Sequence, residues 1–472
     1  MQGHGEEARF RLDALSIAGG CAVLGLVAWF SVQNREYELD DALIYFRYLR
    51  NALDGHGLVY NPGEWHNGLT SPLYTHLAWL VSWLAGGIRG PLWVLASLLT
   101  VGALAALFAL FARGEKRPVF AVLGCGYLAS SLYTYSVYGL ETPLFVGLSA
   151  LCLLLWERER IFGLGVAGAL LVLCRGEGAL LLLAMAAVHL WRGRPLPRPR
   201  DFALPALLLL ANAAHNQATY GAPLPETLMA KIHQGRSGLW GSFPFVRHAG
   251  SQLAYFAGSG VLFTAWLLLA AAGVRRLGRR DASLAILLFL FLLTVFYTAL
   301  QLPQYHWYYA PYHFFGAMYA GLGAAWLYDQ ARHPAGRVAT VAVAVGVLVT
   351  LAWSTATQPL GQSTRERDYR RIAAWLERNT RPDARVAMIE VGIVGYHSRR
   401  PVVDILGVVS PGNAQALGDR RFGDWRDLHR PDLILLHEPL VPHERAAMEG
   451  LPPGAWRRHP RFDVPGYVLL TR

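Results

Sequence analysis

The chain has 472 residues, of which 54% are hydrophobic and only 16% are charged, and its mean hydropathy is +0.28. This composition is too apolar for an ordinary soluble enzyme and is typical of a protein that crosses a membrane several times. The formal net charge is +11. Because the basic residues cluster in short loops between apolar runs, they indicate membrane topology and predict no nucleic-acid partner.

Residues 1–33 combine a charged start with an apolar run that is long enough to cross a bilayer. Acidic residues in the head, and the lack of a small-residue cleavage site, argue against a cleaved signal peptide. We therefore expect a retained signal-anchor helix with a cytoplasmic N-terminus.

Further apolar runs of about spanning length follow this first one, and each needs about 20 residues to cross the bilayer. Together they predict about eleven transmembrane helices, near 15–33, 91–112, 119–137, 142–156, 161–174, 178–191, 201–217, 252–273, 282–302, 311–328 and 337–356. The fold class is therefore mainly α, in a multi-pass membrane protein. We expect residues 1–356 to form the membrane part, with juxtamembrane helices in an outer loop over 34–90.

The run 71–87 is also apolar enough to cross, and the basic loops decide how it lies. These loops fall near 113–117, 158–160, 192–200, 275–280 and 332–337. All five lie on one side, with Arg9 and Arg11, only if 71–87 does not cross. The positive-inside rule makes that side the cytoplasm, so 71–87 is predicted to lie in the interface or to re-enter the membrane without crossing it.

The same topology gathers the polar segments on the outer face. They are the loop with Asp40 and Asp41, "YGLETP" with Glu141, "CRGEG" with Arg175 and Glu177, "YGAPLPETLMAKIHQG" with Glu226 and Lys231, and "LPQYHWYYAPYHFF" with His306 and Tyr308. Ionisable residues at membrane depth are costly, so they tend to mark a site. Their convergence predicts a cavity that opens to the outside.

Asp40 and Asp41 open a predicted helix over 41–53. One interpretation is helix capping, because acids at an N-terminus complement the helix dipole. The other is a general base that takes a proton from an acceptor hydroxyl as it attacks a sugar carbon. Glu141 allows the same two interpretations, as a cap or as a carboxylate that assists the base. A divalent cation at these acids is compatible with the sequence but is not required.

Cations in these segments suit an anionic phosphate, because an arginine fork donates two hydrogen bonds. Arg175 is one candidate, although an ion pair with Glu177 is the simpler interpretation. Lys231 and His306 are further candidates, with interface anchoring as their alternative. Tyr308 belongs to an aromatic belt or stacks on a sugar. A turn places His66 and Asn67, whose substrate role is a hypothesis.

After residue 357 the composition changes. "STRERDYRRIAAWLERNTRPDARVAMIE" predicts a helix followed by a strand, and "RPVVDIL", "PDLILLH" and "GYVLLTR" are short strand-like runs. The alternation predicts a small periplasmic α/β domain over 357–472. It contains no GxGxxG or Walker A motif, so no nucleotide is implied.

Several of these segments together resemble the GT-C superfamily of membrane glycosyltransferases, which use polyprenyl-phosphate sugars. The segments are "LDDALIYFRYLRNALDGHGLVYNPGE", "NGLTSPLYT", "YGLETPLF", "RGEG", "LPETLMAKI" and "HWYYAPY". Within the superfamily they are most similar to the bacterial terminal arabinofuranosyltransferases and the related pilin arabinosyltransferases. The resemblance spans the membrane part and extends weakly into the outer domain.

The resemblance implies that the catalytic base comes from Asp40 and Asp41, and that Glu141 is the outer-loop acid. Arg175 and Glu177 match an Arg-Pro-Glu-Gly segment in which Gly176 replaces the proline. Lys231 matches a lysine suited to the donor phosphate. Glu226 stands where asparagine is more usual, which leaves the role of that position open.

The implied activity is transfer of arabinofuranose from polyprenyl phosphate to a periplasmic glycan or glycoprotein, at the bacterial inner membrane. A different donor sugar, mannose or aminoarabinose, fits the sequence equally well. A transporter or flippase should show paired repeats with broken helices, and none is found. A scaffold that only anchors the outer domain would not need the convergent acids.

Overall fold

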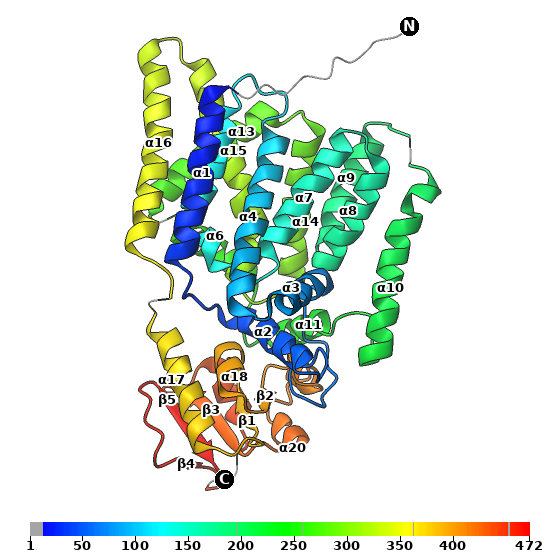
Figure 1. The fold of residues 1–472 in the computed structure, drawn as a ribbon, viewed down its shortest axis with the longest axis vertical. Coiled ribbons are helices and arrows are strands. Elements are labelled where there is room, and N and C mark those ends of the chain that lie inside the picture. The colour runs from blue at the N-terminus through cyan, green and yellow to red at the C-terminus, as the bar shows by residue number, and fades with distance from the viewer. Residues whose placement is uncertain (1–12, 196, 258, 362, 452–453) are drawn as a thin grey trace.

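The computed structural model describes residues 13–195, 197–257, 259–361, 363–451 and 454–472. Arg9 and Arg11, which enter the topology prediction, lie outside the described residues. A long bundle of helices carries a small part with a β-sheet at one of its ends (Figure 1). We call this end of the bundle the docked end, and the other one the opposite end.

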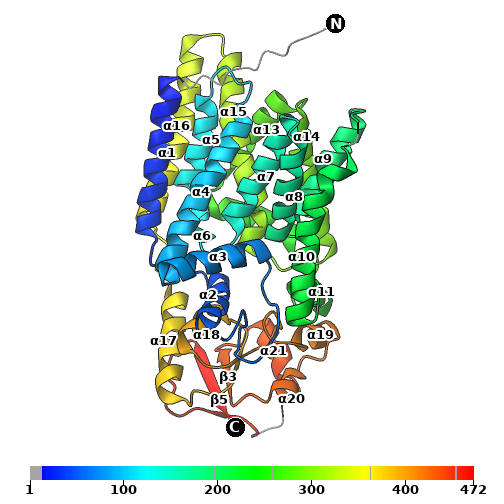
Figure 2. The ribbon, with the colours of Figure 1, turned by 45° about the vertical axis from the view of Figure 1, so that its right-hand side comes forward.

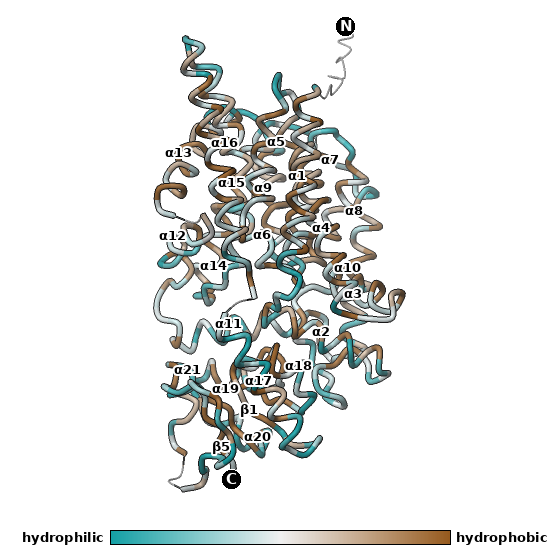
Figure 3. Tube along the Cα trace, turned by 60° about the vertical axis from the view of Figure 1, so that its left-hand side comes forward, coloured by the Kyte–Doolittle hydropathy of each residue, from teal (hydrophilic) through white to brown (hydrophobic). Residues whose placement is uncertain are grey.

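Each of the predicted apolar runs contains one long helix of the bundle. These helices are α1 (Ala14–Gln33), α4 (Arg89–Phe111), α5 (Val119–Ser130), α7 (Thr142–Glu157), α8 (Ile161–Cys174), α9 (Gly178–Trp191), α10 (Ala203–Tyr220), α13 (Gly260–Leu277), α14 (Asp281–Ala299), α15 (Ala310–Gln330) and α16 (Pro334–Thr357). Five of them, α1, α4, α13, α14 and α16, are long and apolar enough to cross a membrane by themselves. Hydrophobic residues follow the bundle, and hydrophilic ones gather at its ends (Figure 3). The protein is a multi-pass membrane protein.

Two predicted spans are shorter in the structure than in the sequence. Residues 119–137 divide into α5 and the short α6 (Leu132–Ser136), because Ser131 between them is extended. The span predicted from 252 begins only at Gly260, where the hydroxyl of Ser259 accepts a hydrogen bond from the backbone of Leu262 at 3.2 Å. The preceding residues belong to a separate helix, α12 (Pro244–Phe256). Local caps of this kind set helix ends more sharply than hydropathy does.

Helix α3 (Pro72–Ala85) is the apolar run that was predicted not to cross. Its 14 residues reach only about 21 Å, which is less than the roughly 30 Å of a bilayer core. It lies across the docked end instead of along the bundle (Figure 2). The remaining short helices are α2 (Asp40–Leu53), α11 (Thr227–Ser237), η1 (Pro199–Phe202) and η2 (His306–Tyr309).

Ion pairs join the basic loops to one another at the opposite end. Arg276 contacts Glu115 at 2.7 Å and Asp329 at 2.8 Å, although these residues come from three different loops or helix ends. Arg192 contacts Asp281 at 2.8 Å. Because these loops meet, they lie on one side of the bundle, as the charge pattern predicts.

The C-terminal part is a five-stranded sheet with helices around it. Its elements are α17 (Thr364–Asn379), β1 (Val386–Met388), α18 (Gly392–Ser398), β2 (Val402–Asp404), α19 (Asn413–Gly418), α20 (Trp425–His429), β3 (Leu433–His437), α21 (Pro442–Met448), β4 (Arg457–Arg458) and β5 (Tyr467–Thr471). The strand order is β2-β1-β3-β5-β4, with β2, β1 and β3 parallel and the other pairings antiparallel. The predicted helix and strands are confirmed.

One hydrophobic core runs from the juxtamembrane helices into the C-terminal sheet. Leu43 and Tyr48 of α2 belong to the same cluster of buried side chains as Val386 of β1 and Leu433 of β3. Burying apolar surface at about 25 cal/mol per Å² makes such a shared core a strong attachment. The C-terminal part is therefore packed firmly on the docked end.

Candidate functional site

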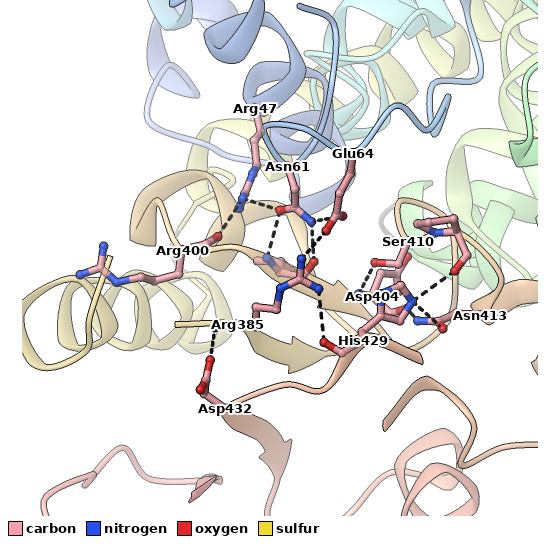
Figure 4. Close-up of polar contacts among 12 residues, drawn as sticks. Arg47, Asn61, Glu64, Arg385, Arg400, Asp404, Ser410, Asn413, His429 and Asp432 are labelled. Carbon is pink, nitrogen blue, oxygen red and sulfur yellow. Dashed lines mark hydrogen bonds and ion pairs between the residues drawn. The ribbon is translucent and has the colours of Figure 1, made fainter. Parts of the chain in front are cut away.

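Arg47 on α2 anchors the C-terminal part through hydrogen bonds to several backbone carbonyls. Its guanidinium donates to the carbonyl oxygens of Gly395 at 2.7 Å and Tyr60 at 2.8 Å. It also donates to the carbonyl oxygen of Arg400 at 2.7 Å (Figure 4). It also donates to Oδ1 of Asn61 at 2.8 Å, and the residue is only 5% exposed. A buried arginine with its donors satisfied fixes geometry well.

Asn61 and Glu64 extend this attachment from the loop after α2. Asn61 pairs with the backbone of Val402, accepting from its N–H at 3.0 Å and donating to its carbonyl at 2.8 Å (Figure 4). Glu64 accepts from Arg385 at 2.9 Å. The loop and the sheet therefore hold a fixed relative position, and side chains from both can build one site.

Asp40 links α2 to α18 of the C-terminal part. Its carboxylate accepts from the backbone N–H groups of Gly392 at 3.0 Å and Ile393 at 2.7 Å, at the N-terminus of α18. A Cβ on Gly392 would lie 1.7 Å from the carbonyl oxygen of Asp40, so only glycine fits there. Both acids lie in the first turn of α2, where they complement its dipole as the capping interpretation expects, but neither caps it through a side-chain hydrogen bond, and Asp40 binds the start of α18 instead.

Asp41 differs from its neighbour. Within the described residues no hydrogen bond or ion pair engages its carboxylate, which is partly exposed. Burial raises the pKa of Asp41 to about 6, against the opposing charge of Lys231 and with the help of the Glu390 carboxylate. A carboxylate that is free of partners and has a pKa near neutrality suits proton transfer.

Lys231 on α11 carries a charge that lowers the pKa of Asp41, as the Arg365 guanidinium also does. Lys231 and Asp41 are close enough to shift each other's pKa, yet too far apart for an ion pair. The ammonium lies 4.6 Å from the ring centre of Tyr305, a cation–π contact. Burial lowers the pKa of Lys231, whereas Asp41 and the buried Asp404 raise it. Lys231 is thus held against the ring of Tyr305, and no ion pair joins it to Asp41.

Glu141, Arg175 and Glu177 form a closed ion network at the docked end. Arg175 contacts Glu141 at 2.6 Å and Glu177 at 2.9 Å. The hydroxyl of Tyr45 donates to Glu141 at 3.1 Å, and that of Tyr297 donates to Glu177 at 2.9 Å. Because two carboxylates already hold Arg175, the network positions the helix ends around the site.

His66 and Asn67 contact the start of α11. Nδ1 of His66 lies 2.5 Å from Glu226, and the backbone N–H of Asn67 donates to the same carboxylate at 3.3 Å. On its other side, Nε2 of His66 lies 3.2 Å from the carbonyl of Val408 in the C-terminal part. Glu226 therefore orients the helix that carries Lys231.

His306 and Tyr308 lie on η2, next to Tyr305. Nε2 of His306 is 3.3 Å from the carbonyl of Ser136, and Tyr133 donates to the carbonyl of His306 at 2.7 Å. The ring of Tyr308 lies 5.4 Å from the guanidinium carbon of Arg175. Both residues therefore contact other residues of the docked end. Tyr308 is buried, so it is not part of an aromatic belt.

The structure thus brings all the predicted site residues to one end, and it adds three from the C-terminal part or nearby that the sequence did not identify. They are Glu390, Asp404 and Glu38. Glu390 and Asp404 stand at the carboxyl ends of β1 and β2, where ligand-binding residues gather in α/β sheets, so a signal was present. Glu38 is 4% exposed and contacts Arg370 at 3.0 Å and His397 at 3.0 Å. Among the described residues no three histidine, cysteine or acidic side chains are grouped as metal ligands.

Comparison with sequences identifies two relationships. Residues 358–470 match a family described as a domain of unknown function, DUF8728. The terminal β-(1→2)-arabinofuranosyltransferase of Mycobacterium tuberculosis (strain ATCC 25618 / H37Rv) is 30% identical in an alignment of 241 residues that covers 45% of this chain. The match covers 38% of the relative's own length.

Comparison with solved structures shows the fold of the whole chain. ArnT from Cupriavidus metallidurans aligns with a TM-score of 0.52 when bound to undecaprenyl phosphate and 0.54 in the apo state. The identities are 13% and 14%, and the alignments cover 96% and 97% of this chain and 97% of ArnT. The arabinofuranosyltransferase AftD from Mycobacteria gives a TM-score of 0.50 at 15% identity, over 98% of this chain and 40% of AftD. The fold is that of the GT-C glycosyltransferases, as the sequence predicts.

Proposed function

We propose that this chain, which has the GT-C fold, is a glycosyltransferase that moves arabinofuranose from a polyprenyl-phosphate donor to a glycan or glycoprotein acceptor. The observation that carries the proposal is that Asp41 and Lys231 lie at the docked end near enough to influence each other's pKa, while no ion pair joins them. The arabinofuranosyltransferase relative supports the sugar, and the ArnT complex with undecaprenyl phosphate supports the lipid.

Asp41 is the general base in this proposal. It takes the proton of an acceptor hydroxyl while the acceptor oxygen bonds to the anomeric carbon. The bond from that carbon to the phosphate oxygen breaks, and its electron pair leaves with the polyprenyl phosphate. Lys231 offsets the negative charge that develops on this leaving group.

The other residues position these two. Asp40 holds α2 against α18, and Glu226 with His66 holds the start of α11. Arg175, between its two carboxylates, joins the ends of α7 and α8.

The lipid tail stays in the bilayer beside the bundle, and the acceptor approaches from the side of the C-terminal part. In the cell this side is the periplasm, and the opposite end with its basic loops faces the cytoplasm.

The test is transfer by the purified full-length protein in detergent, supplied with synthetic polyprenyl-phospho-arabinofuranose and an arabinofuranose trisaccharide. Mass spectrometry should detect a tetrasaccharide. Donors that carry mannose or aminoarabinose are tested in parallel. If sugar is transferred only from the mannose or the aminoarabinose donor, the proposed donor sugar is wrong and the proposed enzyme class stands. If the protein neither transfers the sugar of any donor nor hydrolyses any donor, the glycosyltransferase assignment is overturned.

A further inference from the structure

A loop of the C-terminal part, residues 405–412, folds around the carboxylate of Asp404. This residue ends β2 and is 1% exposed. Its Oδ1 accepts a hydrogen bond from the backbone N–H of Leu406 at 2.8 Å, and its Oδ2 accepts from those of Val408 at 2.5 Å and Val409 at 3.0 Å. Hydrogen bonds to an ionised acceptor are among the strongest in proteins. The path of the loop therefore depends on this one carboxylate.

The backbone of Asp404 is held as well. Its N–H donates to Oγ of Ser410 at 2.9 Å, and its carbonyl accepts from the side-chain amide of Asn413 at 2.7 Å (Figure 4). Oδ1 of Asn413 lies 3.0 Å from Nε2 of His429, which comes from α20. Because residues along the whole loop bond to Asp404, the loop has a fixed shape.

The same loop also contacts the membrane part through its backbone carbonyls. The carbonyl oxygen of Leu406 accepts from Nε2 of Gln234 on α11 at 3.2 Å. That of Val408 lies 3.2 Å from Nε2 of His66, whose Nδ1 contacts Glu226 at the start of α11. The loop is therefore connected to α11 at two points.

Close packing keeps α11 against the C-terminal part. Gln234 is 0% exposed. A Cβ on Gly418 of α19 would lie 2.5 Å from Nδ1 of His233 on α11, so α11 and α19 lie side by side (Figure 2). With 11 residues, α11 is shorter than the roughly 12–15 residues that a helix needs to be stable by itself in water. Its position therefore depends on such contacts.

Lys231 lies one turn before Gln234 on α11. Residues three apart on a helix are neighbours on its surface, so the two side chains start from the same side of α11. The hydrogen bond between Gln234 and Leu406 therefore fixes the rotation of the helix, and with it the direction in which the Lys231 side chain leaves the helix. The ammonium lies 4.6 Å from the ring centre of Tyr305. The loop and Tyr305 together set the place of the cation.

We infer that Asp404 is a positioning residue, which sets the orientation of Lys231 through the loop 405–412 and Gln234. The inference rests on the proposed function for the role of Lys231, whereas the hold of Asp404 on α11 rests on the contacts alone. It gives the part of the chain that matches a domain of unknown function a share in building the site.

Hydrogen exchange measured by mass spectrometry on the full-length protein in detergent tests the hold on α11. Asp404→Asn keeps the size of the side chain but turns one acceptor oxygen into an NH₂ donor that faces N–H groups. We expect the amides of α11 to exchange about tenfold faster, as the net loss of one or two hydrogen bonds implies. Gln234→Leu removes only the bond between the loop and α11, and it serves as a second variant should Asp404→Asn not fold.

Val403→Ala is the matched control for hydrogen exchange. Val403 precedes Asp404 in β2 and is 3% exposed, but its side chain packs on the other face of the sheet. This variant should loosen the sheet and leave the exchange of α11 as in the wild type. If folded Asp404→Asn and Gln234→Leu exchange in α11 like the wild type, the inference is overturned.

A double-mutant cycle tests whether Asp404 acts through Lys231. Asp404→Asn should lower kcat about tenfold, less than the roughly 10²-fold that a misplacement of about 1 Å can cost, and leave the acceptor KM unchanged. In the Lys231→Met background it should lower kcat no further, because a side chain that is absent cannot be misplaced. An equal fall in both backgrounds would show a general loss of structure and overturn the inference. If the wild type transfers no sugar, the proposed function fails, and the exchange of α11 alone decides whether Asp404 positions the helix.

Discussion

Both ends of the helix bundle carry ion-paired arginines, but the docked end also carries an acid, Asp41, that forms no ion pair among the described residues. At the opposite end the arginines close into ion pairs, as Arg276 does with Glu115 and Asp329. At the docked end arginines are paired too, Arg175 with Glu141 and Glu177 and Arg89 with Glu36 and Glu38, whereas Asp41 and Lys231 form no ion pair with each other. The difference teaches that pairing, more than residue type, separates a structural charge from a chemical one.

The two lysines of the chain make the same contrast. Lys116 lies in a loop of the opposite end, and Lys231 lies at the site, whereas every other basic residue is arginine. An ammonium is a compact charge without a fixed bidentate geometry, whereas a planar guanidinium binds carboxylates and phosphates through two parallel hydrogen bonds. A lysine is therefore the better cation for a phosphate that must arrive and leave.

Removing the carboxylate of Asp41 should have the largest effect on activity of all the variants. Asp41→Asn is expected to lower kcat by about 10³-fold, because a general base contributes about 10²–10⁴-fold. Sugar transfer measured by mass spectrometry gives the rate, and donor binding should persist. Asp329→Asn at the opposite end is the control and should keep full activity. Wild-type activity in Asp41→Asn would mean that this acid is not the base.

Removing the charge of Lys231 should have the next largest effect on the rate. Lys231→Met is expected to lower kcat about 10²-fold, in the range known for the loss of one group that stabilises transition-state charge. Lys231→Arg should not restore the rate, because of its different geometry. Lys116→Met is the matched control. Equal rates for both methionine variants would remove Lys231 from the site.

Displacing the C-terminal part should have a smaller effect on activity and a visible one on stability. In Gly392→Ala the new Cβ would lie 1.7 Å from the carbonyl oxygen of Asp40, so α18 must move off α2. We expect transfer to fall about tenfold and stability to fall by about 1–3 kcal/mol, as for overpacked cores. Thermal unfolding in detergent measures the stability.

Gly250→Ala is the control for this variant, since nothing lies within 4 Å of its added Cβ and alanine favours the helix. If Gly392→Ala unfolded and reacted like the wild type, the attachment through Asp40 would not matter for the site.

The smallest expected effect is on the pH dependence of the rate, which tests whether Asp41 is the group that titrates. Because burial raises the pKa of Asp41 to about 6 and the base acts as carboxylate, kcat/KM should fall as the pH drops below about 6 and level off above it. Glu390→Gln removes a neighbouring negative charge that raises this pKa, so the inflection should move to lower pH by less than about one unit. Glu377→Gln, on the exposed side of α17, should leave it unchanged. An inflection that moves upward in Glu390→Gln would contradict the assignment to Asp41.

Much of this architecture can be predicted from local sequence. Apolar runs of spanning length give the helices of the bundle, and the basic loops correctly place α3 outside it, because hydropathy and charge act on each segment independently. The alternation after residue 357 gives the strands β2, β3 and β5. The convergence of Glu141, Arg175, Glu177 and Lys231 on one end also follows from topology alone.

The sequence could not tell Asp40 from Asp41, since the two are adjacent and identical in type. Only the tertiary structure decides between them, because the partners of Asp40 lie 352 and 353 residues away, at the start of α18. Local patterns determine which segments are helices, strands and loops, whereas contacts between distant segments decide that Asp40 is bound and that Asp41 has no hydrogen-bond partner among the described residues.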